Sequence, residues 1–233
     1  MVRPFVVGHR GAAGHEPENT LRSFSKAIEM GVQYVETDIR ETMDGELVVM
    51  HDPKVDRTTN GKGLVRELTL AEIRNLDAGK GEKIPLFSEV MDAVKGRKGG
   101  LIVEIKEPGT EERISSALEA RGLARHSIIV SFFHRSILKV KKTHPELRCG
   151  VIYSGQPVRP WRLALDARAE ILVPNYNYVS TEMVDESHEH GLLVQAWTVN
   201  NRRDAEAMIA AGVDGIASDV PDVVLAAIRG SFT

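Results

Sequence analysis

The chain has 233 residues, of which 42% are hydrophobic and 27% charged, and its formal net charge is −3. This apolar fraction excludes an intrinsically disordered chain, and the longest apolar runs are far too short to cross a bilayer. The single cysteine, Cys149, excludes an intramolecular disulfide and a cysteine-rich zinc site. Long Lys and Arg runs are missing, so nucleic acid is not an expected partner. The N-terminus lacks a signal-peptide pattern, and we expect a cytoplasmic globular protein without stable membrane insertion.

Short β-rich runs recur along the chain, and each is followed by a helical pattern. From the third run onward, successive runs start 21 to 26 residues apart, the length of one strand, one helix and two short loops. Strands that alternate with helices pair in parallel, so the pattern predicts an α/β fold, a (β/α)₈ TIM barrel in one domain over residues 1–233. The predicted strands are Phe5–Gly8, Tyr34–Asp38, Leu101–Lys106, Ser127–Phe132, Arg148–Tyr153, Ile171–Asn175, Leu192–Val199 and Gly215–Asp219.

The first predicted helix is marked at both ends. Leu21, Phe24 and Ile28 recur at the spacing of one helical face, and Gly31 follows as a C-terminal stop. Asn19 stands just before this pattern, and we expect its side chain to cap the helix N-terminus.

One interval breaks the regular spacing, because the second and third runs start 67 residues apart. Asp44-Gly45 is a strong signal for a two-residue turn, so a β-hairpin is predicted after the second barrel strand. A two-residue loop would place His51 opposite Asp38. The hairpin would therefore return His51 to the end of that strand.

The rest of the long interval, about residues 53–85, is polar and rich in glycine. Thr69 and Glu72 match a capping box, which predicts one short helix in this insertion. Connections of this length are uncommon and often functional. We expect the insertion to cap the active-site end of the barrel.

Acidic residues stand inside two of the apolar strands. Glu36 and Asp38 share one face of the second strand, and Glu104 lies in the third. Barrel active sites form at the C-terminal strand ends, and a buried carboxylate is costly unless it is paired or bound to metal. An all-oxygen set suits Mg²⁺ or Ca²⁺ better than zinc. The alternative is a set of internal salt bridges with nearby Arg and Lys residues.

Two histidines and two cations map to the same end of the barrel. His9 and His51 are candidates for proton transfer, since histidine titrates near neutral pH. Arg10 and Lys106 could hold an anionic phosphate, or only balance the charge of the three acids. Trp197, in the seventh strand, could form an apolar wall for part of the substrate or belong to ordinary core packing.

These residues together resemble the glycerophosphodiester phosphodiesterase family. The similarity runs from about His9 to Pro221, and the joint order of its pieces is specific although each piece alone is common. The matching pieces are His9-Arg10-Gly11, Pro17-Glu18-Asn19-Thr20, Glu36-Thr37-Asp38, the hairpin with His51-Asp52, Asp56-Arg57-Thr58-Thr59-Asn60-Gly61, Ile84-Pro85-Leu86, Glu104-Ile105-Lys106, Ser131-Phe132, Trp197-Thr198-Val199-Asn200 and Gly212-Val213-Asp214-Gly215-Ile216.

The resemblance implies metal-dependent hydrolysis of glycerophosphodiesters, the deacylated remains of phospholipids, to glycerol 3-phosphate and an alcohol. The implied roles are binding of one divalent cation, Mg²⁺ or Ca²⁺, for Glu36, Asp38 and Glu104, acid–base catalysis for His9 and His51, and phosphate contact for Arg10 and Lys106. Phe133 stands where relatives often carry a polar residue, so the preferred headgroup stays open.

Other interpretations are carried beside this one. A lysophospholipase D-type enzyme would keep an acyl chain on the substrate, which Phe132, Phe133 and Trp197 could contact. A non-catalytic module that binds a phospho-ligand would not need both histidines. An unrelated barrel lyase that stabilises an enolate with Mg²⁺ would leave His9 and Arg10 unexplained. The choice of cation, the assignment of acid and base, the route through a cyclic phosphate or direct water attack, and the oligomeric state stay open.

Overall fold

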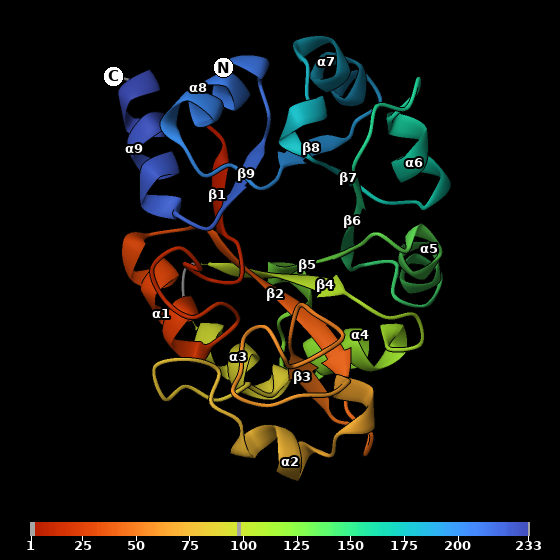
Figure 1. The fold of residues 1–233 in the computed structure, drawn as a ribbon. Coiled ribbons are helices and arrows are strands. Elements are labelled where there is room, and N and C mark those ends of the chain that lie inside the picture. The colour runs from red at the N-terminus through yellow and green to blue at the C-terminus, as the bar shows by residue number, and fades with distance from the viewer. Residues whose placement is uncertain (1–2, 97–98, 233) are drawn as a thin grey trace.

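In the computed structural model, which describes residues 3–96 and 99–232, parallel strands close into a barrel surrounded by helices (Figure 1). Strand β1 pairs with both β2 and β9, which closes the ring and confirms the predicted (β/α)₈ barrel. The barrel strands are β1 (Phe5–Gly8), β2 (Tyr34–Glu41), β4 (Gly100–Ile105), β5 (Ser127–Ser131), β6 (Arg148–Tyr153), β7 (Ile171–Pro174), β8 (Leu193–Ala196) and β9 (Gly215–Ser218).

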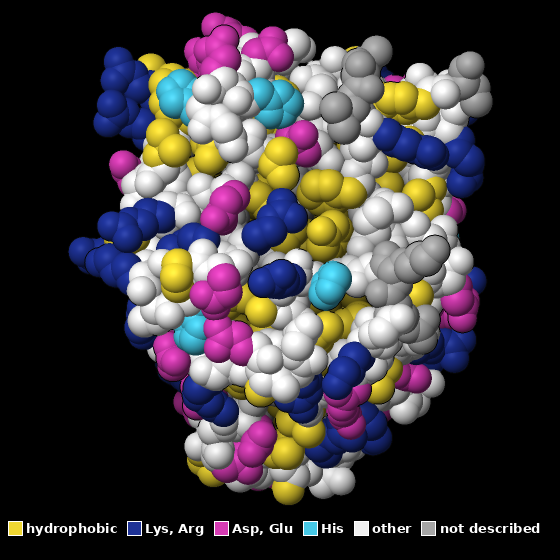
Figure 2. Space-filling view, turned by 180° about the vertical axis from the view of Figure 1, so that it is seen from behind, with side chains coloured by type: hydrophobic (Ala, Val, Ile, Leu, Met, Phe, Trp, Pro, Cys, Tyr) yellow, Lys and Arg dark blue, Asp and Glu magenta, His cyan; other side chains and the backbone are white. Residues whose placement is uncertain are grey.

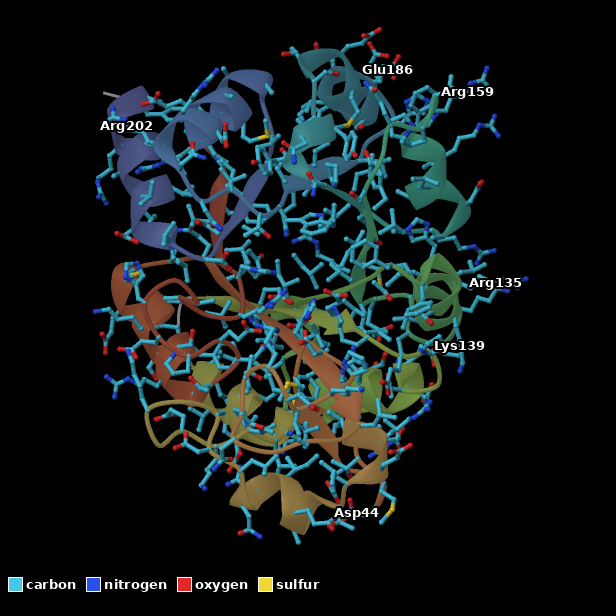
Figure 3. The ribbon with its side chains drawn as sticks, in the orientation of Figure 1. Asp44, Arg135, Lys139, Arg159, Glu186 and Arg202 are labelled. Atoms are coloured by element: carbon cyan, nitrogen blue, oxygen red, sulfur yellow. The ribbon has the colours of Figure 1, made fainter. Side chains whose placement is uncertain are left out.

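Helices follow the strands in sequence and cover the outside of the barrel. They are α1 (Leu21–Met30), α3 (Phe87–Val94), α4 (Glu111–Ala120), α5 (His134–Thr143), α6 (Trp161–Asp166), α7 (Thr181–Glu189), α8 (Arg202–Ala211) and α9 (Pro221–Ser231), with short 3₁₀ helices at Ala124–His126 and Tyr176–Tyr178. Charged side chains labelled on α5 and α8 point outward from this ring (Figure 3). No helix in the described part of the chain is long and apolar enough to span a membrane.

Each barrel strand is buried on both faces, as β4 illustrates. All six of its residues are buried. Leu101 and Val103 point outward into the core between strands and helices, whereas Ile102 and Glu104 point into the barrel. A strand with two buried faces reads as a continuous apolar run. Because Glu104 alternates with the outward-facing Val103, the strand directs its carboxylate into the barrel.

Hydrophobic side chains also reach the surface. Seen from behind, they gather near the middle of the molecule, with charged side chains around them (Figure 2). Partly buried Phe5, Tyr34 and Leu193 pack against the apolar cluster inside the barrel. Exposed apolar atoms are common on folded proteins, so this face alone indicates no partner.

The start of α1 differs from the prediction. Thr20, not Asn19, is the N-cap, and its side chain accepts a hydrogen bond from the backbone of Ser23. Asn19 instead donates its side-chain amide to Asp38 Oδ2 at 2.8 Å. The prediction was wrong because a better-placed hydroxyl follows Asn19 by one residue, which frees the amide for the barrel interior. Gly31 ends the helix as predicted, in the left-handed conformation.

The hairpin register differs from the prediction by one residue. The return strand β3 (Leu47–Val49) pairs antiparallel with β2. Met50, rather than His51, lies opposite Asp38 and donates its backbone N–H to the Asp38 carbonyl at 3.0 Å. His51 therefore lies just beyond the hairpin.

The turn chemistry explains the shift. Thr42 and Glu46 pair through their backbones at 3.0 Å, and the Thr42 hydroxyl accepts a second hydrogen bond from the Glu46 N–H at 2.9 Å. These bonds close a loop of three residues that ends at Gly45, whose φ is +84°. A three-residue loop with a left-handed glycine competes with the two-residue turn that Asp44-Gly45 suggests.

The insertion after the hairpin has its own small apolar cluster. It contains a 3₁₀ helix, Val65–Glu67, and a short helix α2 (Leu70–Asn75). Thr69 and Glu72 form the predicted capping box at the start of α2. The capping box satisfies two backbone N–H groups at the N-terminus of α2, and Ile73 on its apolar side is buried. The buried members of the cluster are Val48, Met50, Val55, Val65, Ile73, Ala78 and Ile84.

A buried histidine outside the barrel gives the stability a predictable pH dependence. His144 Nδ1 lies 2.7 Å from Glu119 and Nε2 lies 3.2 Å from Glu112. Burial opposes the charged imidazole, but these two carboxylates raise the pKa of His144 above its usual value. The interaction is present below the unfolded-state pKa of about 6.5 and is lost as the pH rises through the folded-state value.

We therefore expect His144→Gln to lower the free energy of unfolding by about 1 kcal/mol at pH 5.5 and by less at pH 9. Urea unfolding at both pH values measures this difference. His126→Gln, at an exposed position, is the matched control and should change little. An equal effect of His144→Gln at both pH values would contradict the ion-pair account.

Candidate active site

A cavity opens at the C-terminal ends of the barrel strands, where active sites of this architecture lie. It is lined by His9, Arg10, Glu36, His51, Ile102, Glu104, Val130, Phe132, Ile152, Val173, Gln195, Trp197 and Ala217. Six of the eight residues singled out in the sequence thus share one cavity. The other two, Asp38 and Lys106, are joined to that set by ion pairs with Arg10 and Glu104.

The turn after β1 holds Arg10 and Gly11, which follow His9, in an unusual backbone conformation. Arg10 has a φ of +51° and Gly11 a φ of +85°. A Cβ atom on Gly11 would lie 2.5 Å from the Ser23 carbonyl carbon, so only glycine fits here. The Arg10 backbone N–H donates to Glu36 at 2.9 Å, which ties the turn to the acidic cluster. Non-glycine residues with positive φ are often found at functional sites.

Three carboxylates from the paired strands β2 and β4 meet inside the barrel. Glu36, Asp38 and Glu104 are 6%, 1% and 8% exposed, and each offers an oxygen within 4.8 Å of the others. Lys106 Nζ lies 2.8 Å from Glu104 and 3.3 Å from Asp38 Oδ1. The internal salt bridges considered above therefore exist, but one ammonium group is shared between two carboxylates. Asp38 Oδ1, although buried, accepts no hydrogen bond from any described residue.

The pKa values of the three acids are shifted in different directions. Burial raises the pKa of Glu36 well above its usual value, and the negative charge of Asp38 adds to this shift. Burial and Asp38 likewise raise the pKa of Glu104 to about 7. Burial would also raise the pKa of Asp38, but the charges of Lys106 and Arg10 hold it below its usual range.

This charge pattern fits a divalent cation. The described cations do not compensate three ionised carboxylates at this depth, so Glu36 and Glu104 retain protons to unusually high pH. A doubly charged ion would replace those protons, and its preferred ligands are carboxylate oxygens. Asp38 Oδ1, which faces Lys106 Nζ at 3.3 Å but accepts no hydrogen bond from a described residue, is a further possible ligand atom. The residues present are therefore suited to holding Mg²⁺ or Ca²⁺.

His9 is backed by a carboxylate that the sequence analysis did not single out. Its Nδ1 donates to Asp219 Oδ1 at 2.7 Å. Asn200 holds Asp219 through two bonds, from its own amide to Asp219 Oδ2 at 2.6 Å and from the Asp219 N–H to Asn200 Oδ1 at 2.9 Å. With Nδ1 engaged, Nε2 is the ring nitrogen left for a ligand. Asp219 directly follows β9, which pairs with β1. An acidic residue at the C-terminal end of the strand next to His9 is the sequence signal that could have identified this partner.

His51 is positioned in a similar way. Its Nδ1 lies 2.7 Å from Asp52 Oδ1, and Arg57 binds both oxygens of Asp52 at 2.7 and 3.0 Å. The Arg40 guanidinium donates twice to the His51 carbonyl, at 3.0 and 2.7 Å. Burial lowers the pKa of His51, although Asp38 and Asp52 oppose the shift. Its ring is therefore biased toward the neutral form that can accept a proton.

Glu18 joins the two sides of the site. It accepts hydrogen bonds from Arg10 at 2.8 Å and from both terminal nitrogens of Arg57 at 2.8 Å. These contacts give Glu18 a supporting role at the site, from a position just before the N-cap of α1. Burial opposes ionisation, but the two guanidinium groups lower the pKa of Glu18. Glu18 therefore stays ionised and restrains both arginines.

The opposite wall of the cavity is apolar and aromatic. The rings of Phe132 and Trp197 meet edge to face at 5.6 Å, and Trp197 Nε1 donates to the Val173 carbonyl at 2.9 Å. Trp197 thus lines the cavity in addition to packing. Phe132 lines it too and is 45% exposed. Phe133 is exposed and does not line this cavity.

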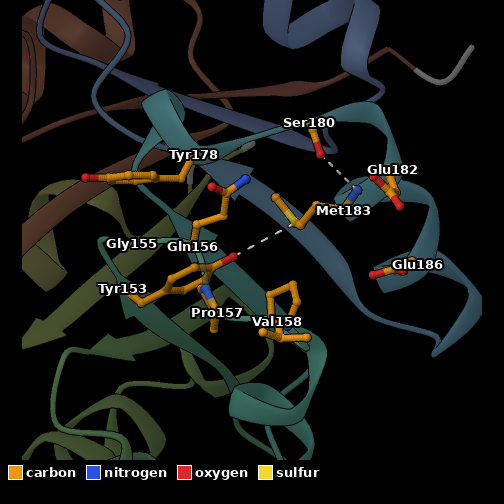
Figure 4. Close-up of a pocket in the computed structure, with 11 residues that line it drawn as sticks. Tyr153, Gly155, Gln156, Pro157, Val158, Tyr178, Ser180, Glu182, Met183 and Glu186 are labelled. Atoms are coloured by element: carbon orange, nitrogen blue, oxygen red, sulfur yellow. Dashed lines mark hydrogen bonds between the residues drawn. The ribbon is translucent and has the colours of Figure 1, made fainter.

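A second cavity lies outside the barrel wall, between the loop that follows β6 and helix α7 (Figure 4). Tyr153 and Tyr178 line it, together with Gln156 and Met183. The Tyr153 hydroxyl and the Met183 sulfur are 3.9 Å apart. Because Ile152 points into the barrel, its neighbour Tyr153 points outward, and strand β6 lies between the two cavities.

Comparisons with known proteins agree with this geometry. A family model described as the glycerophosphoryl diester phosphodiesterase family matches residues 9–223. The chain is 39% identical to a glycerophosphodiester phosphodiesterase of Caldanaerobacter subterraneus, over 98% of this chain and 99% of the relative. It is 35% identical to a Bacillus subtilis enzyme of the same name, over 95% and 85%. An Oleispira antarctica phosphodiesterase, solved with the product sn-glycerol-3-phosphate, matches with a TM-score of 0.89 and 30% identity, over 97% of each chain.

Proposed function

This chain belongs to the glycerophosphoryl diester phosphodiesterase family, and on that premise we propose that it hydrolyses glycerophosphodiesters to glycerol 3-phosphate and an alcohol. The observation that carries the proposal is the convergence of two histidines, three carboxylates and two cations at one end of the barrel. The Caldanaerobacter and Bacillus relatives are named for this activity. The Oleispira structure contains the product that the proposal requires.

We infer that Glu36, Asp38 and Glu104 hold one divalent cation, Mg²⁺ or Ca²⁺. Their mutual proximity, burial and raised pKa values support this inference. A cation bound there would neutralise the phosphate and stabilise the negative charge that grows in the transition state.

Arg10 and Lys106 would hold the phosphate beside the acidic cluster. The Arg10 guanidinium is fixed by Glu18, and its Nε is buried and donates no hydrogen bond to a described residue. The Lys106 ammonium group lies between Asp38 and Glu104. From this position it would also attract the negatively charged phosphate of the substrate. A guanidinium fork and a compact ammonium group together neutralise and orient a phosphodiester.

His9 and His51 would move the two protons of the reaction. One removes a proton from the attacking hydroxyl, and the other protonates the departing oxygen. Asp219 and Asp52 hold the Nδ1 atoms, which leaves both Nε2 atoms for substrate. The attacker is either the neighbouring glycerol hydroxyl, giving a cyclic phosphate that water then opens, or water itself, and both routes use the same two groups.

We also propose that residues 53–85 cap the active-site end within one catalytic domain. Arg57 supports this placement, because it belongs to the insertion and its side chain forms ion pairs with Glu18 and Asp52 at the site. The insertion would then help to set the preference for the leaving alcohol.

The substrate class is tested with a panel of glycerophosphodiesters of choline, ethanolamine and glycerol, in the presence of Mg²⁺ or Ca²⁺. We expect glycerol 3-phosphate and the free alcohol as products, detected by a coupled dehydrogenase assay. Release of a phosphoalcohol and free glycerol would mean that the other ester bond is cleaved. Either that outcome or no turnover of the whole panel would contradict the proposal.

The Asp219–His9 pair makes a prediction of its own. Asp219→Asn should lower kcat about 10- to 100-fold, because the amide no longer fixes the His9 tautomer, while KM changes little. Steady-state kinetics with glycerophosphocholine measure both constants. Asp222→Asn is the matched control, since Asp222 pairs with His15 at 2.8 Å outside the cavity. Equal losses in the two variants would show that the Asp219 pair has no special role.

A further inference from the structure

One polar side chain in the catalytic cavity has no part in the chemistry described so far. Gln195 lies in β8 and lines the cavity, two residues before Trp197 and on the same side of the strand. It is 3% exposed, and its Oε1 has no hydrogen-bond partner among residues 3–96 and 99–232. A buried amide oxygen without a partner is costly, and such a group calls for an explanation in a folded protein.

The position of Gln195 separates it from the charged groups. In the ring of strands β1, β2, β4, β5, β6, β7, β8 and β9, strand β8 lies opposite β4. Glu104 and the acidic cluster therefore stand across the cavity from the amide. Ile152, Val173 and Ala217 line the cavity on the strands of that half of the ring. Among the described residues that line this cavity, Gln195 is the only uncharged polar side chain apart from the indole of Trp197 and the histidines.

A neutral amide in an apolar wall suits a neutral ligand group with matching hydrogen bonds. A carboxamide both donates and accepts, and so does an alcohol hydroxyl. The charged half of the cavity is suited to the phosphate, and the hydroxyl next to the ester would lie beside it. With the phosphate and the adjacent hydroxyl in the charged half of the cavity, the terminal hydroxyl of glycerol would extend toward the apolar half that contains Gln195.

Resting on the function proposed above, we propose that Gln195 binds the terminal hydroxyl of the glycerol moiety. It thereby selects glycerol phosphodiesters over phosphodiesters whose corresponding carbon carries no hydroxyl. A site built around a hydroxyl discriminates strongly, because an analogue without that hydroxyl leaves a buried polar group unpaired.

Two substrates with the same leaving alcohol test this assignment. Glycerophosphocholine carries both glycerol hydroxyls, whereas the phosphocholine ester of propane-1,2-diol keeps the hydroxyl next to the phosphate ester and lacks the terminal one. For the wild-type protein, kcat/KM should be about 10- to 100-fold lower with the propanediol substrate. Gln195→Leu should lose about the same factor with glycerophosphocholine and change less than about twofold with the propanediol substrate. Gln156→Leu, in the second cavity, is the control and should change neither value.

A binding measurement checks the assignment without turnover. Glycerol 3-phosphate should inhibit the wild-type protein about 10- to 100-fold more strongly than propanediol phosphate, and this preference should vanish in Gln195→Leu. Gln195→Met replaces the leucine variant if the latter melts below the assay temperature. Equal losses of Gln195→Leu on both substrates, or no loss on either, would overturn the proposal. If the wild-type protein hydrolysed no glycerophosphodiester, the proposed function would fail instead.

Discussion

Replacing His51 or His9 by alanine is expected to lower kcat about 10²- to 10⁴-fold with glycerophosphocholine as substrate. Each variant removes one of the two proposed proton carriers while leaving in place the acidic cluster and the two cations proposed to hold the phosphate. The double variant should be little worse than either single variant, because the two histidines act in one proton-transfer sequence. Single-turnover and steady-state kinetics measure these effects.

Folding controls accompany the histidine variants. Both side chains lie at the rim of the barrel, 16% and 33% exposed, so alanine should leave the melting temperature within a few degrees of wild type. His15→Ala is the matched surface control, since His15 has a similar pairing with Asp222 outside the cavity. Retention of wild-type kcat by a folded His9→Ala or His51→Ala protein would exclude that histidine from catalysis.

The second large effect concerns the cation. At a free concentration of about 100 times its dissociation constant, Mg²⁺ or Ca²⁺ should stabilise the fold by about 2.7 kcal/mol, which is about 5–10 °C in melting temperature for a chain of this size. Glu104→Gln removes one of the three proposed anionic ligands and should abolish most of this shift. Glu119→Gln is the control, because Glu119 belongs to a separate group with His144 and Glu146. A shift lost in Glu119→Gln but kept in Glu104→Gln would place the cation elsewhere.

This shift should also depend on pH with a defined sign. The pKa of Glu104 rises from 4.5 to about 7 in the metal-free fold, mainly through burial. Protonation of a group with a raised pKa contributes stability that is lost as the pH rises through that value. The proton and the cation compete for the same carboxylate, so less cation binding is expected at low pH. The cation should therefore stabilise the protein more at pH 8 than at pH 5.5. Scanning calorimetry at the two pH values measures the difference, and the opposite order would contradict the assigned charge states.

Sequence periodicity was sufficient to predict the barrel because each βα unit repeats the same physical requirement. A parallel strand needs a crossover helix, and two buried faces need an apolar run, so the spacing of the runs follows the architecture. The acidic residues stood out for the same reason, since Glu36 and Glu104 interrupt such runs. Their side-chain direction followed from strand alternation alone.

Supporting residues were harder to predict, because their roles depend on contacts distant in sequence. Asp219 reaches His9 only because β9 closes the ring against β1, 210 residues away along the chain. Asn19 was assigned to a helix cap on local preference, yet its amide binds Asp38 in strand β2. The predicted hairpin register was wrong by one residue, because the Thr42 side chain stabilises a loop of three residues instead of two.

The most direct test of the central account is the release of glycerol 3-phosphate from glycerophosphocholine before and after removal of divalent cations. We predict that a chelator abolishes release by the wild-type protein, and that added Mg²⁺ or Ca²⁺ restores it in wild type but not in Glu104→Gln. Undiminished release by the fully chelated protein would contradict a cation held by Glu36, Asp38 and Glu104 as part of the catalytic site.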